Sequence, residues 1–94
     1  MAGQENSRVN FHPEIHEEED EVWIWLPEFI IYGAGDTLVE AWADLQEETR
    51  RYIEVYLEDV AFGASVNRGL QRPHVLVAQA ANTAGKLAVV LMGE

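Results

Sequence analysis

One long amphipathic segment, residues 36–60, constrains the fold of this 94-residue chain more than any other feature. Its apolar side chains recur at three- and four-residue intervals, which places them on a single stripe of a helix. They are Leu38, Trp42, Leu45, Tyr52, Ile53, Tyr56, Leu57 and Val60, with Thr49 in the one polar slot. Thr37 and Glu40 have the spacing of a capping box, and Glu47 and Arg51 have that of a helical ion pair. The pattern predicts one continuous helix with a buried stripe and an acidic, exposed face.

Three short strands are predicted before this helix. Residues 9–18 alternate between apolar and polar side chains, and Pro13 indicates an edge strand or a bulge because proline has no N–H to donate. Residues 22–26 (Val-Trp-Ile-Trp-Leu) form a second strand that is apolar on both faces, and residues 29–32 form a third. Gly33 and Gly35 then release the chain from the strand.

The chain after the helix is predicted to return once to the sheet. Residues 61–73 are rich in Gly, Ala, Asn and Arg and indicate a loop, whereas the apolar, β-branched residues 74–79 indicate a fourth strand. Asn82 and Thr83 offer a cap for a second helix over residues 84–92, and a fifth strand over residues 86–92 is the alternative. We therefore expect a loose start (1–8) and one α+β domain (9–94) with an antiparallel sheet and the order β-β-β-α-β-α.

Acidic side chains dominate the charge of the chain. It has 17 Asp and Glu against 6 Lys and Arg, which gives a formal net charge of −11. Such a surface repels phosphate, so we expect no direct contact with nucleic acid and none with a membrane. The same charge attracts a basic protein and speeds its encounter, although it also serves solubility alone.

Cysteine is absent, which excludes a disulfide scaffold, a thiolate metal site and a cysteine nucleophile. No apolar run is long enough to span a bilayer, and the first residues lack the basic and apolar regions of a signal peptide. We therefore expect a cytoplasmic protein.

Few side chains have a pattern that indicates catalysis or metal binding. His12, Glu14, His16 and Glu18 share one face of the first predicted strand, but same-face neighbours lie nearly 7 Å apart, so only two of them reach a common ion. The two serines lie outside any nucleophile elbow, and residues 33–36 lack the lysine and third glycine of a phosphate-binding loop. We expect no catalytic residue, no metal and no cofactor, and hence no enzyme.

Seven residues form the candidate partner-binding set. Five adjacent carboxylates repel one another in any dry environment, so we expect them to form a hairpin turn at the surface. Two tryptophans follow and alternate with Val22, Ile24 and Leu26, so they face the other side of their strand. They belong to the core, where large aromatic residues usually lie, or they form an exposed patch that anchors a partner. The set is Glu17, Glu18, Glu19, Asp20, Glu21, Trp23 and Trp25.

Two stretches, residues 23–29 (Trp-Ile-Trp-Leu-Pro-Glu-Phe) and 32–41 (Tyr-Gly-Ala-Gly-Asp-Thr-Leu-Val-Glu-Ala), resemble the signature of HicB-like antitoxins. The resemblance covers residues 22–79 and is closer still to the HicB-like C-terminal region of Phd/YefM-type antitoxins. It implies an incomplete RNase H-like fold and a protein that neutralises a toxin, typically a small ribonuclease. These antitoxins usually carry a DNA-binding segment, and none is recognisable in this sequence.

Two hypotheses follow for the function. The first is an acidic, antitoxin-like protein, expected to be a homodimer, that binds a basic, RNA-cleaving toxin by protein–protein contact. The second is a self-associating structural or adaptor domain without a toxin partner, because the sheet has more apolar surface than one helix covers.

Overall fold

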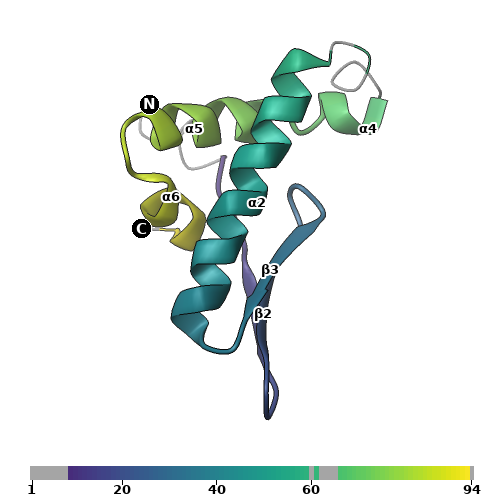
Figure 1. Ribbon diagram of the computed structural model, residues 1–94. Helices are drawn as coiled ribbons and strands as arrows, with labels where there is room; N and C mark the ends of the chain where they lie inside the picture. Colours follow the sequence, from purple (N-terminus) through teal and green to yellow (C-terminus); the bar gives the residue numbers. More distant parts are fainter. Residues whose placement is uncertain (1–8, 60, 62–65, 94) are drawn as a thin grey trace.

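The computed structural model describes residues 9–59, 61 and 66–93 of the chain. Three strands are followed by helices (Figure 1): β1 (Glu14–Glu17), β2 (Val22–Leu26), β3 (Ile31–Gly35), α2 (Leu38–Glu58), α4 (Val66–Gly69), α5 (Arg72–Thr83) and α6 (Leu87–Met92). The strands form one antiparallel sheet in the order β1-β2-β3. The expected α+β class is therefore confirmed. No described helix is both long and apolar enough to cross a membrane. The expected loose start, residues 1–8, lies outside the described residues.

Helix α2 confirms the prediction of one continuous amphipathic helix. The Thr37 hydroxyl accepts a hydrogen bond from the Glu40 N–H at 3.2 Å. The Glu40 carboxylate accepts from the Asp36 N–H at 2.9 Å, one residue earlier than in a standard capping box. Buried Thr49 is satisfied within the helix, because its hydroxyl donates to the Leu45 carbonyl at 2.7 Å. This last bond explains why a polar residue is accepted in the buried stripe.

Two details of the predicted helix differ in the structure. The expected ion pair between Glu47 and Arg51 is wrong, since Glu47 pairs with Arg50 at 2.9 Å and Arg51 pairs with Glu48. Both pairs join residues three apart, and side chains three apart are neighbours on a helix just as side chains four apart are. The two ends of the predicted stripe, Leu38 and Leu57, are more than a third exposed, and Val60 lies outside the described residues.

The third strand lies two residues later than predicted, and both glycines are inside it. Strand β3 covers Ile31–Gly35 rather than residues 29–32, because residues 27–30 form the turn after β2. A Cβ atom on Gly33 would lie 2.3 Å from the backbone nitrogen of Leu45. Glycine is therefore required here for the close approach of α2 to the strand. The expectation that these glycines release the chain from the sheet is therefore wrong for Gly33, whereas Gly35 is the last residue of the strand.

The first strand is shorter than the predicted residues 9–18. Only Glu14–Glu17 pair with β2, and Pro13 precedes them, as expected for a residue that cannot donate to the ladder. Phe11 nevertheless lies in the core, where its ring packs edge-on against Phe29 with the centroids 5.4 Å apart. The segment before β1 is thus anchored by packing without pairing as a strand.

The predicted fourth strand over residues 74–79 is wrong, since these residues lie in helix α5. Pro73 stands at the start of that helix, a position where its missing N–H costs nothing. Val75, Ala78 and Ala81 are buried at three-residue intervals, which is a helical spacing. A six-residue apolar run is ambiguous by itself, and the alanine-rich continuation decides for helix. The predicted loop, residues 61–73, contains α4 and the start of α5, and residues 62–65 lie outside the described residues.

The second predicted helix is present as α6, so the alternative of a fifth strand is wrong. It begins at Leu87 rather than at residue 84, because Asn82 and Thr83 still belong to α5. Helix α5 ends in a Schellman motif. The Lys86 N–H donates to the Ala81 carbonyl at 2.7 Å, and the Gly85 N–H donates to the Asn82 carbonyl at 3.1 Å. Gly85 has the left-handed φ of 74° that this motif requires.

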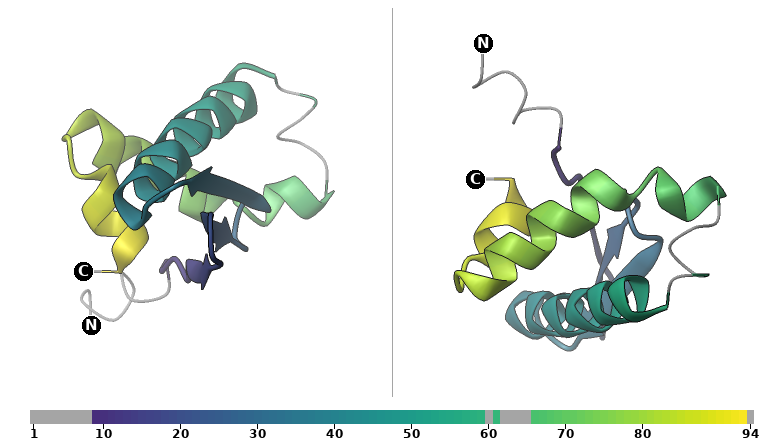
Figure 2. Two further views of the ribbon diagram at one scale, coloured as in Figure 1. Left: turned by 60° about the horizontal axis from the view of Figure 1, so that its bottom comes forward. Right: turned by 90° about the horizontal axis from the view of Figure 1, so that it is seen from above.

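The core lies between the sheet and the helices. Helix α2 covers one face of the sheet, and α5 and α6 pack against α2 (Figures 1 and 2). Val22, Ile24 and Leu26 point toward α2 and are buried together with side chains of α5 and α6, among them Val75, Leu87 and Leu91. We call the face of the sheet opposite α2 the outer face.

Candidate partner-binding face

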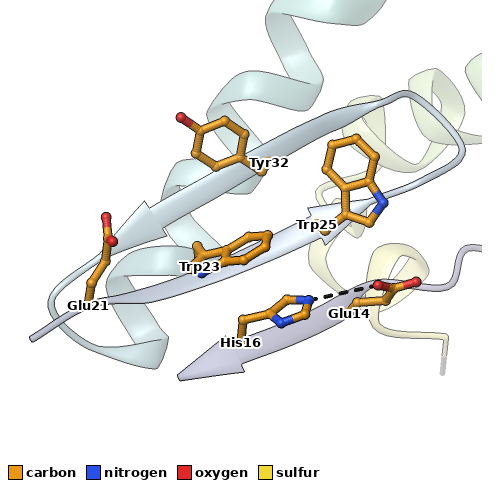
Figure 3. Close-up of a pocket in the computed structure, with 6 residues that line it drawn as sticks. All are labelled: Glu14, His16, Glu21, Trp23, Trp25 and Tyr32. Carbon is orange, nitrogen blue, oxygen red and sulfur yellow. Dashed lines mark ion pairs between the residues drawn. The ribbon is translucent and has the colours of Figure 1, made fainter. Parts of the chain in front are cut away.

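An open groove of about 660 Å³ lies on the outer face of the sheet (Figure 3). All three strands and the β1–β2 turn contribute to it, because side chains of the same parity point to the same side. We call it the aromatic groove. Its lining residues are Glu14, His16, Glu21, Trp23, Trp25 and Tyr32.

The register of the strands brings the aromatic rings together. Trp23 lies opposite His16 of β1, and Trp25 lies opposite Tyr32 of β3. The His16 ring stacks on Trp23 with the centroids 4.0 Å apart and the planes at 11°. Tyr32 meets Trp23 edge-on at 6.4 Å and is 58% exposed. The groove is therefore a row of rings across the sheet, open to solvent on one side.

Carboxylates border this row of rings. Glu14 lies opposite Trp25 in the β1–β2 register, and its Oε1 is 3.8 Å from His16 Nε2. Glu21 stands at the other end of the groove, where the turn enters β2 (Figure 3). An apolar floor with an anionic border is suited to a partner that is both apolar and positively charged.

The acidic run forms the predicted hairpin turn between β1 and β2. The Glu18 N–H donates to the Glu21 carbonyl at 2.8 Å, and all five acidic side chains are exposed. Only Glu21 lines the aromatic groove. Glu17 lies opposite Val22 and so has the parity of the face that α2 covers. The structure thus brings the turn to one end of the groove without placing every carboxylate in it.

The two tryptophans do not lie in the core, so that interpretation is wrong. Trp23 and Trp25 are partly exposed on the outer face, and Val22, Ile24 and Leu26 fill the core from the same strand. No described segment covers the groove, so the second expectation, an exposed apolar patch, holds for the part of the chain that the structure describes.

The four residues considered as metal ligands do not come together, although Glu14 and His16 are neighbours at 3.8 Å. The backbone N–H of His12 donates to Glu28 Oε1 at 3.1 Å, and the ring Nδ1 lies 2.7 Å from Glu28 Oε2. His16 instead stacks on Trp23. Within residues 9–59, 61 and 66–93, no three His, Cys, Asp or Glu side chains are grouped to hold a metal ion.

Two tyrosines of α2 hold the segment that follows the helix. The Tyr56 hydroxyl donates to the Arg68 carbonyl at 2.6 Å, and the Tyr52 hydroxyl donates to Gln71. Burial raises the pKa of the Tyr52 hydroxyl above its ordinary value of 10.0, and the neighbouring Arg68 opposes part of that effect. These contacts connect α4 and the start of α5 to α2, which is a structural role and agrees with the predicted place of both tyrosines in the buried stripe.

The predicted partner-binding set does not include Glu14 and Tyr32, which also line the groove. The sequence pattern places Tyr32 at the end of its strand and offers Glu14 only as a metal ligand. The alternation of each strand contains part of the signal, but the register between strands decides which side chains meet.

Comparison with known proteins identifies the family of the chain. Residues 5–91 match the model of a PHD-like family described as "Antitoxin of toxin-antitoxin, RelE / RelB, TA system". No curated protein and no solved structure matches the chain. The match extends over nearly the whole sequence, so the chain belongs to this family of antitoxins of toxin–antitoxin systems.

Proposed function

We propose that this antitoxin neutralises a small, basic, RNA-cleaving toxin by protein–protein contact in the cytoplasm. The contact surface is the aromatic groove together with the acidic turn Glu17–Glu21. One observation carries this assignment: a row of partly exposed rings, bordered by carboxylates, lies on the one face of the sheet that no described helix covers. Family membership points to a binding and regulatory protein rather than to an enzyme.

Charge supports a basic partner. A toxin that cleaves RNA needs a positively charged surface for the phosphate backbone. A protein with a net charge of −11 is attracted to such a surface, and its exposed carboxylates at Glu17–Glu21 can occupy the place of phosphate groups. Neutralisation then results from occlusion of the toxin's RNA-binding surface.

The aromatic groove supplies binding affinity that charge alone does not provide. Exposed ion pairs contribute little affinity because water and salt screen them. Tryptophan and tyrosine are enriched among the residues that carry binding energy in interfaces. Burial of Trp23, Trp25 and Tyr32 against the toxin would therefore hold the complex that electrostatic attraction brings together.

The HicB-like assignment remains a proposal for the part of the chain that carries its signature sequences. Residues 22–58, which contain β2, β3 and α2, carry the signature sequences, and we propose that they form the HicB-like unit. The unit is expected to act as a homodimer.

Co-expression tests the proposed function. The antitoxin should restore growth to cells that express the toxin encoded beside it, and an affinity tag on the antitoxin should recover that toxin. Wild-type chain that neither restores growth nor recovers a basic protein would overturn the proposal.

The uncovered rings also favour a second candidate function, self-association through the aromatic groove. Its test is the mass in solution. A monomer by light scattering at high concentration rejects self-association, whereas a dimer that Trp25→Ala dissociates supports it.

A further inference from the structure

The two tryptophans of the aromatic groove are not equivalent. Trp23 is covered, since the His16 ring stacks on it at 4.0 Å and Tyr32 meets it edge-on at 6.4 Å. Among the described residues, no ring stacks on Trp25 (Figure 3). Trp25 is therefore the tryptophan of the groove whose ring face is not stacked on by a described ring.

The neighbours of Trp25 give this surface a chemical character. The strand register places Glu14 directly opposite Trp25 on β1 and Tyr32 directly opposite on β3. The side chain of Glu14 is 58% exposed, and its contact with His16 Nε2 is long at 3.8 Å. A group that lies on Trp25 thus has a carboxylate with free acceptor positions on one side and a phenol ring on the other.

A planar cation fits these surroundings best. An anion is repelled by Glu14 and Glu21, and a wholly apolar group would desolvate Glu14 without replacing its hydrogen bonds. A guanidinium ion stacks on an indole face and donates two parallel hydrogen bonds to a carboxylate. An ammonium ion is compact and strongly hydrated, so it gains less from the flat ring.

We propose that Trp25, Glu14 and Tyr32 form a receptor for an arginine side chain of the partner. Trp25 is the stacking surface, Glu14 accepts the hydrogen bonds, and Tyr32 closes the side of the pocket. The inference rests on the proposed function for one point only, namely that the arginine belongs to the toxin. It deepens that function by naming the chemical group that the groove selects.

The experiment uses three peptides that are identical except at one position, which holds arginine, lysine or citrulline. Binding is followed by NMR through the indole N–H signals of the three tryptophans, assigned with single Trp→Phe variants. Trp42 lies on α2 and serves as an internal reference. The arginine peptide should shift the Trp25 signal saturably and leave the Trp42 signal in place. The lysine peptide should bind roughly fivefold more weakly, and uncharged citrulline should bind more weakly still.

Matched variants separate a specific receptor from general charge attraction. Glu14→Gln should weaken binding of the arginine peptide by roughly fivefold. Glu54→Gln removes the same charge from an exposed site on α2 and should leave binding unchanged. Glu14→Gln preserves the shape of the side chain, so it tests the receptor without removing a ring from the sheet. An unchanged Trp25 signal, equal binding of all three peptides, or equal effects of the two glutamine variants would each overturn the proposal.

Failure of the arginine receptor can be distinguished from failure of the proposed antitoxin function. If the antitoxin captures its toxin but the arginine peptide does not bind, the arginine receptor is wrong and the antitoxin function stands. If the peptide binds at Trp25 but no toxin is captured or neutralised, the receptor stands and the proposed function fails.

Discussion

Replacement of Gly33 by alanine tests how the sheet that carries the groove is held by α2. The new Cβ atom would lie 2.3 Å from the Leu45 nitrogen, 2.6 Å from the Leu45 Cα atom and 2.7 Å from the Ala41 carbonyl oxygen. All three are backbone atoms, so no side chain can rotate away. Ordinary contact begins at 3.4 Å, so α2 has to withdraw from β3 by about 1 Å, which forfeits roughly a quarter to a half of the dispersion energy at that contact.

The expected cost follows from two opposing terms. Overpacking of a close contact typically costs about 1–3 kcal/mol, and more where backbone must move. Alanine returns about 0.4–1 kcal/mol by restricting the unfolded chain. We therefore expect Gly33→Ala to lower the free energy of unfolding by about 2 kcal/mol or more, and the melting temperature by roughly 10 °C.

Urea denaturation followed by tryptophan fluorescence measures this difference. Gly69→Ala is the matched control, because a Cβ atom added at Gly69 would meet no neighbouring side chain or distant backbone within 4 Å, and the φ of this residue is not positive. Its stability should change by less than about 0.5 kcal/mol. Equal midpoints for the two variants would show that α2 does not rest on the Gly33 backbone, and the reasoning about the sheet would be refuted.

Three further predictions concern the sheet edge, a helix end and a tyrosine. The Asp44 carboxylate accepts from the Ala34 N–H at 2.9 Å at the outer edge of β3, so Asp44→Ala should cost about 1–2 kcal/mol in urea denaturation and promote association by light scattering. Asp44→Asn keeps a hydrogen-bond acceptor, so it should neither lower stability nor promote association. Gly85→Ala forces alanine to a φ of 74° and should lower the free energy of unfolding by about 1 kcal/mol, whereas Gly85→Asn should cost less. Because burial raises the pKa of Tyr52 in the folded state, its contribution to stability is fully present below pH 10.0 and is lost as the pH rises through the folded pKa. The Tyr52→Phe variant should therefore show a smaller fall in the urea midpoint above that pH, and an identical fall would contradict the assignment.

Sequence reasoning succeeded where one periodicity extended without interruption. The stripe from Leu38 to Tyr56 fits only a helix, and Thr37 with Glu40 marked its start. The alternation of residues 22–26 likewise identified β2 and its two faces, but it did not decide which face fills the core.

Reasoning from the sequence failed where a short apolar run was interpreted without the residues on either side of it. Residues 74–79 are β-branched enough for a strand, but Pro73 before them and the alanines after them favour α5. Gly33 and Gly35 indicated a chain break, because a glycine that admits a neighbouring helix looks the same in sequence as one that ends a strand. The flanking residues decided the first case, and the packing of α2 on β3 decided the second.

The candidate site was predicted only in part, because some of its residues come from strands that meet only in the folded sheet. Trp23, Trp25 and the acidic turn are visible in one stretch of sequence. Glu14 and Tyr32 join them only through the pairing of β1 and β3 with β2. Register is a property of the assembled sheet, and no local pattern contains it.

The most direct test of the central claim is the affinity of the antitoxin for its toxin, measured by calorimetry with single variants. Trp25→Ala should weaken binding by about tenfold or more, as expected for an aromatic anchor in an interface. Leu76→Ala removes a 43% exposed apolar side chain of α5, outside the groove, and should bind like the wild type. If Trp25→Ala binds as tightly as Leu76→Ala does, the outer face of the sheet does not bind the toxin.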